Sequence, residues 1–133
     1  RISDKIEIHF TFEKTFNYNI NHNKALVEWV IENIVKNAID AMKGKGVLKI
    51  DLTKKNNAFQ IDISDTGCGM PSKEFKTIFK PGYTNKKRGW GLGLALTKRI
   101  IEDYHKGQVF VLKSEIKKGT TFRIVLPKKP INP

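Results

Sequence analysis

One stretch of the sequence, from Lys24 to Met42, limits the possible folds more than any other. Apolar residues recur there at positions i, i+3, i+4 and i+7, the spacing that places them along one side of a helix. Asn23 is a residue type that caps helix beginnings, and Gly44-Lys45-Gly46 supplies a stop. The stretch therefore predicts a long helix whose apolar side lies on a surface that the rest of the chain supplies. Its apolar positions are Leu26, Val27, Val30, Ile31, Ile34, Val35, Ala38, Ile39 and Met42.

Strands are the predicted source of that surface. Apolar and polar residues alternate, as in half-buried strands, over residues 6–12, 48–52, 59–63, 108–112 and 120–126, and we expect a further short strand at 16–20. A short helix from Ser72 to about Ile78, capped by Ser72, and a second long helix over 92–104 complete the order. Strands outnumber crossover helices. We therefore expect a mixed β-sheet covered on one face by helices, which is a two-layer α/β sandwich.

The size and composition of the chain fit one domain spanning residues 1–133. Of its residues 39% are hydrophobic, enough for one core, and its lone cysteine, Cys68, excludes an intramolecular disulfide framework. No stretch approaches the roughly 20 apolar residues of a membrane-spanning helix. Because the sequence begins at Arg1 without a start methionine or a signal peptide, we interpret it as a fragment of a longer protein.

The chain carries a strong positive charge, with 25 Lys and Arg against 13 Asp and Glu, a formal net charge of +12. Such a charge is compatible with a nucleic-acid-binding module. However, the lysines are scattered along the sequence, which is typical of a solvated surface, and no aromatic-rich basic face is evident. We therefore keep nucleic-acid binding as a distant alternative.

Two asparagines on the first predicted helix are candidates for a binding site. Asn33 and Asn37 are four residues apart, so their side chains project from the same side of the helix, one turn apart. An amide oxygen is a neutral ligand of the kind that Mg²⁺ accepts. By itself the pair is also compatible with an ordinary polar helix face.

Two glycine-containing motifs follow. Asp65-x-Gly67-x-Gly69 comes directly after a strand, where a carboxylate can accept a hydrogen bond and glycines allow a tight turn. Gly89-Trp90-Gly91-Leu92-Gly93 opens the second long helix, where free backbone N–H groups and the helix dipole favour an anion such as phosphate. The second motif follows a long loop and lacks Gly-Lys-Ser/Thr, so it is neither a Rossmann fingerprint nor a Walker A loop.

The segment between these motifs, 79–91, is rich in glycine and cations and predicts a mobile loop. Phe79 is expected to anchor its base in the core. Lys86, Lys87 and Arg88 either reach a triphosphate or form a plain basic loop.

The order of these motifs resembles that of one family. Asn-x-x-x-Asn-Ala, Asp-x-Gly-x-Gly-Met, Phe-x-Pro, Gly-x-Gly-Leu-Gly-Leu and Gly-Thr-Thr-Phe succeed one another over about residues 24–127. This series is similar to the catalytic and ATP-binding domain of bacterial sensor histidine kinases, whose superfamily includes DNA gyrase B, the mismatch-repair ATPase and the large heat-shock chaperone. The resemblance implies the Bergerat ATP-binding fold and binding of ATP with Mg²⁺.

The resemblance also implies roles for individual residues. Asn37 matches the asparagine that ligates Mg²⁺, Asp65 the aspartate that recognises the adenine amino group, and Thr120 the threonine that supports this aspartate. The glycines of the helix opening match those whose backbone approaches the phosphates. The implied ATP-binding residues are Asn33, Asn37, Asp65, Gly67, Gly69, Lys86, Lys87, Arg88, Gly89, Gly91, Leu92, Gly93 and Thr120.

Some positions depart from the family pattern, and one of them bears on the reaction. Gyrase-like members carry a water-activating glutamate four residues before the metal-binding asparagine, where this chain has Asn33. Glu32, one residue earlier, points about 100° away around the helix. Efficient attack by water is therefore not expected, and transfer of the γ-phosphoryl group to a protein acceptor is favoured. Elsewhere, Gly82 replaces a common aromatic residue and Asp40 replaces a lysine of several relatives.

We do not expect the phosphorylated residue on this chain. The family's histidine is usually followed by an acidic residue, whereas His9, His22 and His105 are followed by Phe, Asn and Lys. The resemblance implies an acceptor histidine on an upstream helical dimerisation domain, with a response regulator as an indirect partner. It also implies a monomeric isolated domain, a homodimeric full protein and a cytoplasmic domain, with membrane anchoring of the parent left open. A serine acceptor, as in anti-sigma-factor or mitochondrial kinases, is the alternative.

Overall fold

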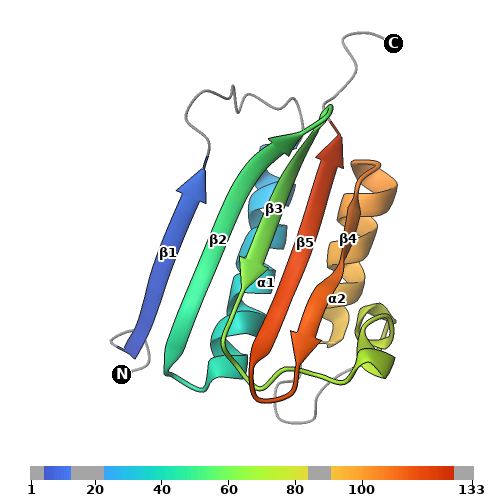
Figure 1. Cartoon of the computed structure of the whole chain (residues 1–133). Helices are drawn as coiled ribbons and strands as arrows, with labels where there is room; N and C mark the ends of the chain where they lie inside the picture. Colours follow the sequence, from blue (N-terminus) through green and yellow to red (C-terminus); the bar gives the residue numbers. More distant parts are fainter. Residues whose placement is uncertain (1–4, 13–22, 84–90, 128–133) are drawn as a thin grey trace, which may run out of the picture.

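The computed structural model describes residues 5–12, 23–83 and 91–127, with only the backbone described for Gly91 and Leu92. These residues contain one five-stranded sheet in the order β1-β2-β3-β5-β4. Both long helices lie on one face of this sheet (Figure 1). The expected two-layer α/β sandwich with a mixed sheet is therefore confirmed. Its elements are β1 (Ile6–Phe12), α1 (Lys24–Met42), β2 (Gly46–Lys55), β3 (Ala58–Ser64), η2 (Ser72–Glu74), η3 (Thr77–Phe79), α2 (Gly91–Lys98), η4 (Arg99–Tyr104), β4 (Gln108–Glu115) and β5 (Gly119–Pro127).

The sheet is mixed because of its first connection. β1 and β2 are parallel, so the chain between them crosses the sheet, and it does so through α1. The other neighbouring strands are antiparallel, with β2–β3 and β4–β5 joined as hairpins. As a result, the C-terminal end of α1, the loop after β3 and the β4–β5 turn all lie at the same end of the molecule, the lower end in Figure 1.

Helix α1 has the predicted bounds, and its caps explain them. Asn23 accepts a hydrogen bond from the backbone N–H of Leu26 at 3.1 Å, which satisfies one free donor of the first turn. At the other end Lys43, and not a glycine, first turns into the left-handed region with φ 53°. The buried side of the helix matches the predicted apolar stripe and consists of Val27, Val30, Ile34, Ala38 and Met42, together with the polar Asn37.

The hydrophobic core lies between this stripe and the covered face of the sheet. Its most deeply buried large side chains come from several elements, which locks the helices onto the strands: they are Ile34, Leu48, Ile63, Ile101, Ile124 and Leu126. Phe79 joins the core as expected, edge-to-face with Phe122 at a centroid distance of 6.1 Å. The segment that precedes residue 84 is thereby anchored.

Strand β1 is more exposed than the alternation predicted. Its residues Ile8 and Phe10 are each 62% exposed although they lie on the same face as the buried Leu48 of β2. The reason is position: β1 is an edge strand, and α1 contacts β2, β3 and β5 instead. The further strand expected at 16–20 lies outside the described residues.

Two predicted helices differ in type. The helix expected from Ser72 is two short 3₁₀ turns, η2 and η3, and Pro71, not Ser72, stands at the N-cap. The second long helix is α-helical only to Lys98 and continues as the π-helical segment η4. In η4 the carbonyl of Ile100 accepts the backbone N–H of His105 at 3.1 Å, and it also pairs with the His105 ring nitrogen Nδ1 at 2.8 Å. These two bonds to one carbonyl widen the last turn.

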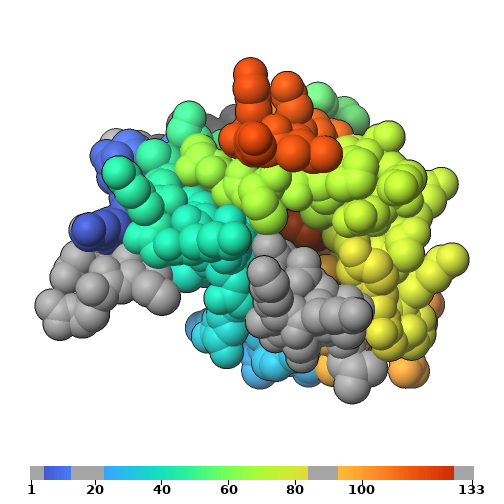
Figure 2. Space-filling view, turned by 90° about the horizontal axis from the view of Figure 1, so that it is seen from below, coloured from blue at the N-terminus to red at the C-terminus, as the bar shows by residue number. Residues whose placement is uncertain are grey.

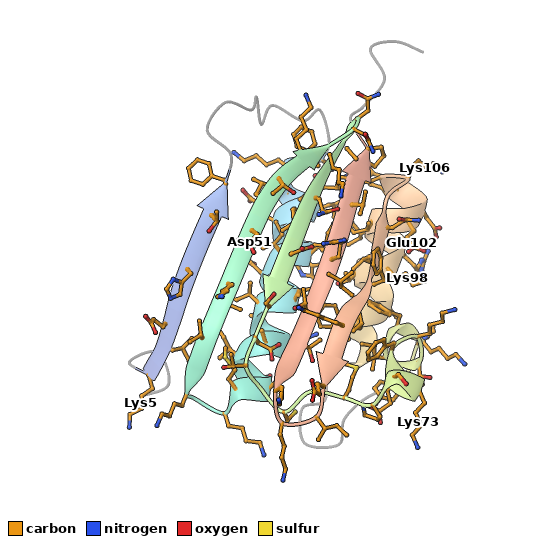
Figure 3. The ribbon with its side chains drawn as sticks, viewed as in Figure 1. Lys5, Asp51, Lys73, Lys98, Glu102 and Lys106 are labelled. Atoms are coloured by element: carbon orange, nitrogen blue, oxygen red, sulfur yellow. The ribbon has the colours of Figure 1, made fainter. Side chains whose placement is uncertain are left out.

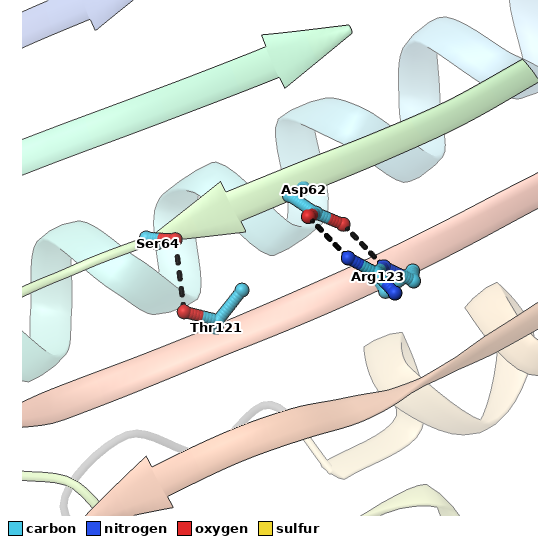
Figure 4. A network of polar contacts seen from close by, with 4 residues as sticks. All are labelled: Asp62, Ser64, Thr121 and Arg123. Atoms are coloured by element: carbon cyan, nitrogen blue, oxygen red, sulfur yellow. Dashed lines mark hydrogen bonds and ion pairs between the residues drawn. The ribbon is translucent and has the colours of Figure 1, made fainter. Parts of the chain in front are cut away.

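The opposite face of the sheet is polar. Arg123 on β5 donates two hydrogen bonds of 2.8 Å to the carboxylate of Asp62 on β3, and Ser64 and Thr121 are joined at 2.8 Å two register pairs along, on the same face (Figure 4). The hydrogen bond to Asp62 raises the pKa of Arg123, because it stabilises the charged form. In the described part of the chain, no helix has the length and apolarity needed to span a membrane.

Candidate functional site

Helix α1 organises the candidate site, because residues one turn apart on it meet different segments of the chain. Asn33, Asn37 and Ala41 succeed one another at intervals of four residues along one side of the helix. Asn33 contacts α2, and Ala41 contacts the loop after β3. Asn37 lies between these two contacts.

At the first of these positions, the side chain of Asn33 rests on α2. Its amide nitrogen Nδ2 donates to the hydroxyl of Thr97 at 3.2 Å. A Cβ atom added to Gly93 would lie 2.8 Å from both Asn33 amide atoms, closer than such contacts allow. A larger residue at position 93 would therefore displace the Asn33 side chain, so the glycine suits the close approach of α2 to α1.

The central residue, Asn37, is a buried polar group that lacks a partner. Only 4% of its surface is exposed, and neither Oδ1 nor Nδ2 forms a hydrogen bond with any of the described residues. Leaving such a group unsatisfied costs about 1–3 kcal/mol. An arrangement of this kind suits an amide that is satisfied by a ligand from outside the chain.

The loop after β3 contacts the C-terminal end of α1. The backbone N–H of Cys68 donates to the carbonyl oxygen of Ala41 at 3.1 Å. A Cβ atom on Gly67 would lie 2.6 Å from both the carbonyl carbon and the oxygen of Ala41. Gly67 thus allows two backbones to touch, which fixes the loop relative to Asn37.

Asp65 is held at the start of this loop. Its side chain is 7% exposed, and its Oδ1 accepts the backbone N–H of Gly67 at 2.7 Å and that of Thr120 at 3.3 Å. The backbone N–H of Asp65 donates in turn to the carbonyl of Thr120 at 2.9 Å. The carboxylate orientation is therefore set by the loop after β3 and by β5 together.

The β4–β5 turn closes the same end. The hydroxyl of Ser114 accepts the backbone N–H of Met70 at 2.9 Å and lies 2.7 Å from the hydroxyl of Thr120. The N–H of Lys117 donates to the carbonyl of Cys68 at 2.7 Å, and Gly69, with φ 69°, lies so close to the Glu115 carbonyl that a Cβ would overlap it. Loop and turn form one hydrogen-bonded unit.

Seen from this end, the molecular surface is hollowed beside the loop after β3, between that loop and the short helices η2 and η3, and atoms of the C-terminal hairpin lie at the bottom of the hollow (Figure 2). Seven predicted site residues belong to the segments assembled at this end: Asn33, Asn37, Asp65, Gly67, Gly69, Gly93 and Thr120.

The remaining predicted site residues are placed less fully. Gly91 and Leu92 belong to the first turn of α2, with only their backbone described. The predicted residues Lys86, Lys87, Arg88 and Gly89 lie outside the described ranges.

Sequence reasoning missed three residues that build the site. Ala41 had no signal, because it acts through its backbone carbonyl. Ser114 had no clear signal either, because it lies near the end of a strand among residues of mixed type. Thr97 did leave a signal: it is a polar residue at a core position of a predicted helix, three residues after Leu94 and four before Ile101, and it is fully buried.

The fold and the site together define a class: a two-layer α/β sandwich in which helix ends and glycine-rich turns enclose a hollow at one end of the sheet. Over residues 22–130 the chain matches the family described as Histidine kinase-, DNA gyrase B-, and HSP90-like ATPase, and it belongs to this family. Its similarities place it among the ATP-binding catalytic domains of sensor histidine kinases, as the motif order had suggested.

Two curated relatives illustrate the similarity. Sporulation kinase C of Bacillus subtilis is 38% identical over 128 residues, which are 96% of this chain and 29% of that protein. The signal transduction histidine-protein kinase AtoS of Escherichia coli is 39% identical over 112 residues, covering 84% of this chain and 18% of that protein. The chain thus spans less than a third of the length of these relatives.

Solved structures agree. The catalytic domain of histidine kinase ThkA, in a nucleotide-free form, superimposes with a TM-score of 0.83 at 27% identity, covering 94% of this chain and 82% of that one. The mycobacterial sensor histidine kinase MprB gives a TM-score of 0.80 at 25% identity, covering 95% and 84%.

Proposed function

We propose that residues 1–133 form the catalytic domain of a longer sensor kinase, which binds ATP with Mg²⁺ and presents the γ-phosphoryl group to a histidine on a separate domain. One observation supports this most strongly. The buried carboxamide of Asn37, which has no hydrogen-bond partner in the described part of the chain, lies between the Asn33 contact with α2 and the Ala41 contact with the loop. That is where a ligand is needed to satisfy it.

Each end of the proposed site suits one part of the nucleotide. Asp65, held by backbone N–H groups and supported by Thr120, suits recognition of the adenine amino group. The first turn of α2, which begins at Gly91 and includes Gly93, suits phosphates through its free backbone N–H groups. Lys86, Lys87 and Arg88, which precede this turn in the sequence, add positive charge for a triphosphate.

The Mg²⁺ ion that the family implies fits the same residues. Its preferred ligands are oxygen atoms, and the Oδ1 of Asn37 is buried without a hydrogen bond to the described residues. When bound, the ion neutralises negative charge on the phosphate oxygens. Asn33 and Asn37 would hold the metal-bound phosphates from the side of α1.

Transfer to a protein acceptor is favoured over hydrolysis. Asn33 has no carboxylate with which to activate water, and Glu32, the neighbouring acid, is exposed on a different side of α1. Phosphoryl transfer depends mainly on positioning and charge neutralisation, which the site supplies. The acceptor is proposed to lie on an upstream helical dimerisation domain: in the described ranges His9 is exposed on β1, and buried His105 accepts the N–H of Asn23.

The partners follow from this proposal. One structural neighbour, histidine kinase ThkA, is known in complex with the response regulator protein TrrA. We propose a receiver domain as the indirect partner here, with the isolated chain a monomer, the full protein a homodimer and this domain cytoplasmic. Nucleic acid is not an expected partner: Lys5, Lys73 and Lys106 project from different parts of the molecule instead of one face (Figure 3).

Calorimetry with a nonhydrolysable ATP analogue, with and without Mg²⁺, tests the proposal. The folded chain is expected to bind the analogue more tightly with Mg²⁺, and Asn37→Ala to bind at least tenfold more weakly. Asn57→Ala, which alters an exposed turn residue, is the matched control and should bind normally. No binding by the folded wild-type chain, or equal binding by both variants, would contradict the proposal.

The acceptor needs a second assay. The chain is mixed with ATP and the separately produced dimerisation domain of its own parent protein, and the labelled product is exposed to acid. Phosphohistidine is acid-labile, whereas phosphoserine survives. Loss of the label in acid supports a histidine acceptor, and an acid-stable label would favour the serine-kinase alternative.

A further inference from the structure

Thr97 combines full burial with a polar contact to the candidate site. None of its surface is exposed, and it lies on the core-facing side of α2 with Leu94, one turn before the buried Ile101 of η4. Its hydroxyl accepts the Nδ2 of Asn33 at 3.2 Å, across 64 residues of sequence. An apolar side chain would fill this core position equally well, so packing does not explain why the residue carries a hydroxyl.

The contact is part of a two-point support. Thr97 and Gly93 are one turn apart on α2, and both lie against the side chain of Asn33: Thr97 through its hydroxyl, and Gly93 through a backbone so close that an added Cβ would displace the amide. The half-buried carboxamide on α1 is therefore hydrogen-bonded by one turn of α2 and packed against the turn before it. Asn37, the unpartnered amide, lies one turn further along α1.

We propose that Thr97 is a positioning residue for nucleotide binding. Its hydroxyl holds the Asn33 side chain in place, and this sets the separation between the amides of α1 and the glycine-rich beginning of α2. Thr97 acts only through Asn33. The inference deepens, and rests on, the proposed binding of ATP with Mg²⁺ between these helices.

Two substitutions of Thr97 distinguish a role in positioning Asn33 from a role in packing the core. Thr97→Val keeps the side-chain shape but removes the acceptor, so the Asn33 amide loses its anchor while the core stays filled. Thr97→Ser keeps the hydroxyl and removes a methyl group, so it loses packing while the anchor remains. A purely structural Thr97 would make Ser the more harmful change, because a buried methyl group contributes to stability.

The test measures binding of a nonhydrolysable ATP analogue with Mg²⁺, together with the melting temperature of each variant. We expect Thr97→Val to bind about fivefold more weakly, in line with the loss of one hydrogen bond. Thr97→Ser should bind within about twofold of wild type, a smaller change than that hydrogen bond would cause. Thr53→Val, on β2 and pairing with Gln60, removes a threonine hydroxyl away from the site and should bind as wild type.

A double-mutant cycle with Asn33→Ala completes the test. If Thr97 acts through Asn33, then Thr97→Val weakens binding in the wild-type background but not in Asn33→Ala. Should Thr97→Val fail to fold, Thr97→Ala, which also lacks the hydroxyl, takes its place. Normal binding by the hydroxyl-free variant, or an equal loss in both backgrounds, would overturn this inference alone. A wild-type chain that binds no nucleotide would overturn the proposed function and the inference with it.

Discussion

The two ends of the candidate site differ in how completely the chain satisfies its own polar groups. Asp65 is surrounded by backbone donors, and the loop that follows it is tied to the β4–β5 turn through Ser114 and Lys117. Asn37, by contrast, is buried without a hydrogen bond to any described residue. We infer that the end proposed for adenine is preformed, whereas the end proposed for phosphate and metal is completed by the ligand.

Adding a side chain at Gly69 is expected to disrupt the preformed end of the site most strongly. A Cβ there overlaps the carbonyl of Glu115, and the positive φ of 69° is itself unfavourable. We expect Gly69→Ala to lower the free energy of unfolding by about 3 kcal/mol, measured by urea denaturation.

Gly82→Ala is the matched control for this change. Gly82 has a similar φ of 84°, but nothing lies within 4 Å of an added Cβ. It should lose only about 1 kcal/mol, the cost of the backbone conformation alone. Equal losses at both positions would mean that the contact between loop and turn does not constrain the site.

A substitution of Asn37 tests the other end of the site, the one proposed for phosphate and metal. Replacing an unsatisfied buried amide with an apolar side chain of similar size removes a desolvation penalty, so Asn37→Leu should raise the free energy of unfolding by about 1 kcal/mol. The same change should weaken binding of an ATP analogue with Mg²⁺ at least tenfold. Greater stability with lost binding is the pattern expected where function, and not folding, requires a residue. A destabilised Asn37→Leu would instead assign the amide a structural role.

Ser114 tests whether the preformed end acts as a unit. Its hydroxyl accepts the Met70 N–H and meets the Thr120 hydroxyl, so Ser114→Ala leaves the half-buried Met70 N–H without its acceptor. We expect a loss of about 1–2 kcal/mol in unfolding free energy, with weaker binding of adenosine as well as of ATP analogues. Ser72→Ala, at an exposed serine that caps no helix through its side chain, is the control. Weaker ATP binding with unchanged adenosine binding would contradict the assignment of this end to adenine.

The comparison also explains what the sequence could predict. Regular periodicity predicted α1 with its true bounds, because a strongly amphipathic helix depends on its own spacing and caps. The order of the motifs predicted the family. Contacts made by backbone atoms, such as the Ala41 carbonyl with the Cys68 N–H, could not be predicted, because they carry no residue-type signal.

The errors have physical causes too. The exposure of β1 depends on which strand lies at the edge of the sheet, and that is a property of the whole topology. The π-helical end of the second helix depends on the His105 side chain bonding to the Ile100 carbonyl, a tertiary detail that helical periodicity does not report. Local spacing therefore predicted the elements, whereas their ends and edges required the assembled structure.

A substitution on the polar face of the sheet is expected to have the smallest effect, and it serves as a reference for the other variants. Arg123 and Asp62 lie on this face, opposite the helices, with side chains 25% and 18% exposed. We expect Arg123→Met to lower the free energy of unfolding by only about 1 kcal/mol, because part of the pair's energy is already lost to solvent. Binding of the ATP analogue should not change.

The pH dependence of this pair follows from the sign of the shift. The pKa of Arg123 is raised in the folded state by its hydrogen bond to Asp62, so the stabilisation is present below the ordinary pKa of arginine. This stabilisation is lost only as the pH rises through the pKa of Arg123 in the folded state, which is higher still. The difference in unfolding free energy between wild type and Arg123→Met should therefore be constant between about pH 6 and 9. A difference that falls within this range, or a change in nucleotide binding, would show that this face of the sheet is coupled to the site.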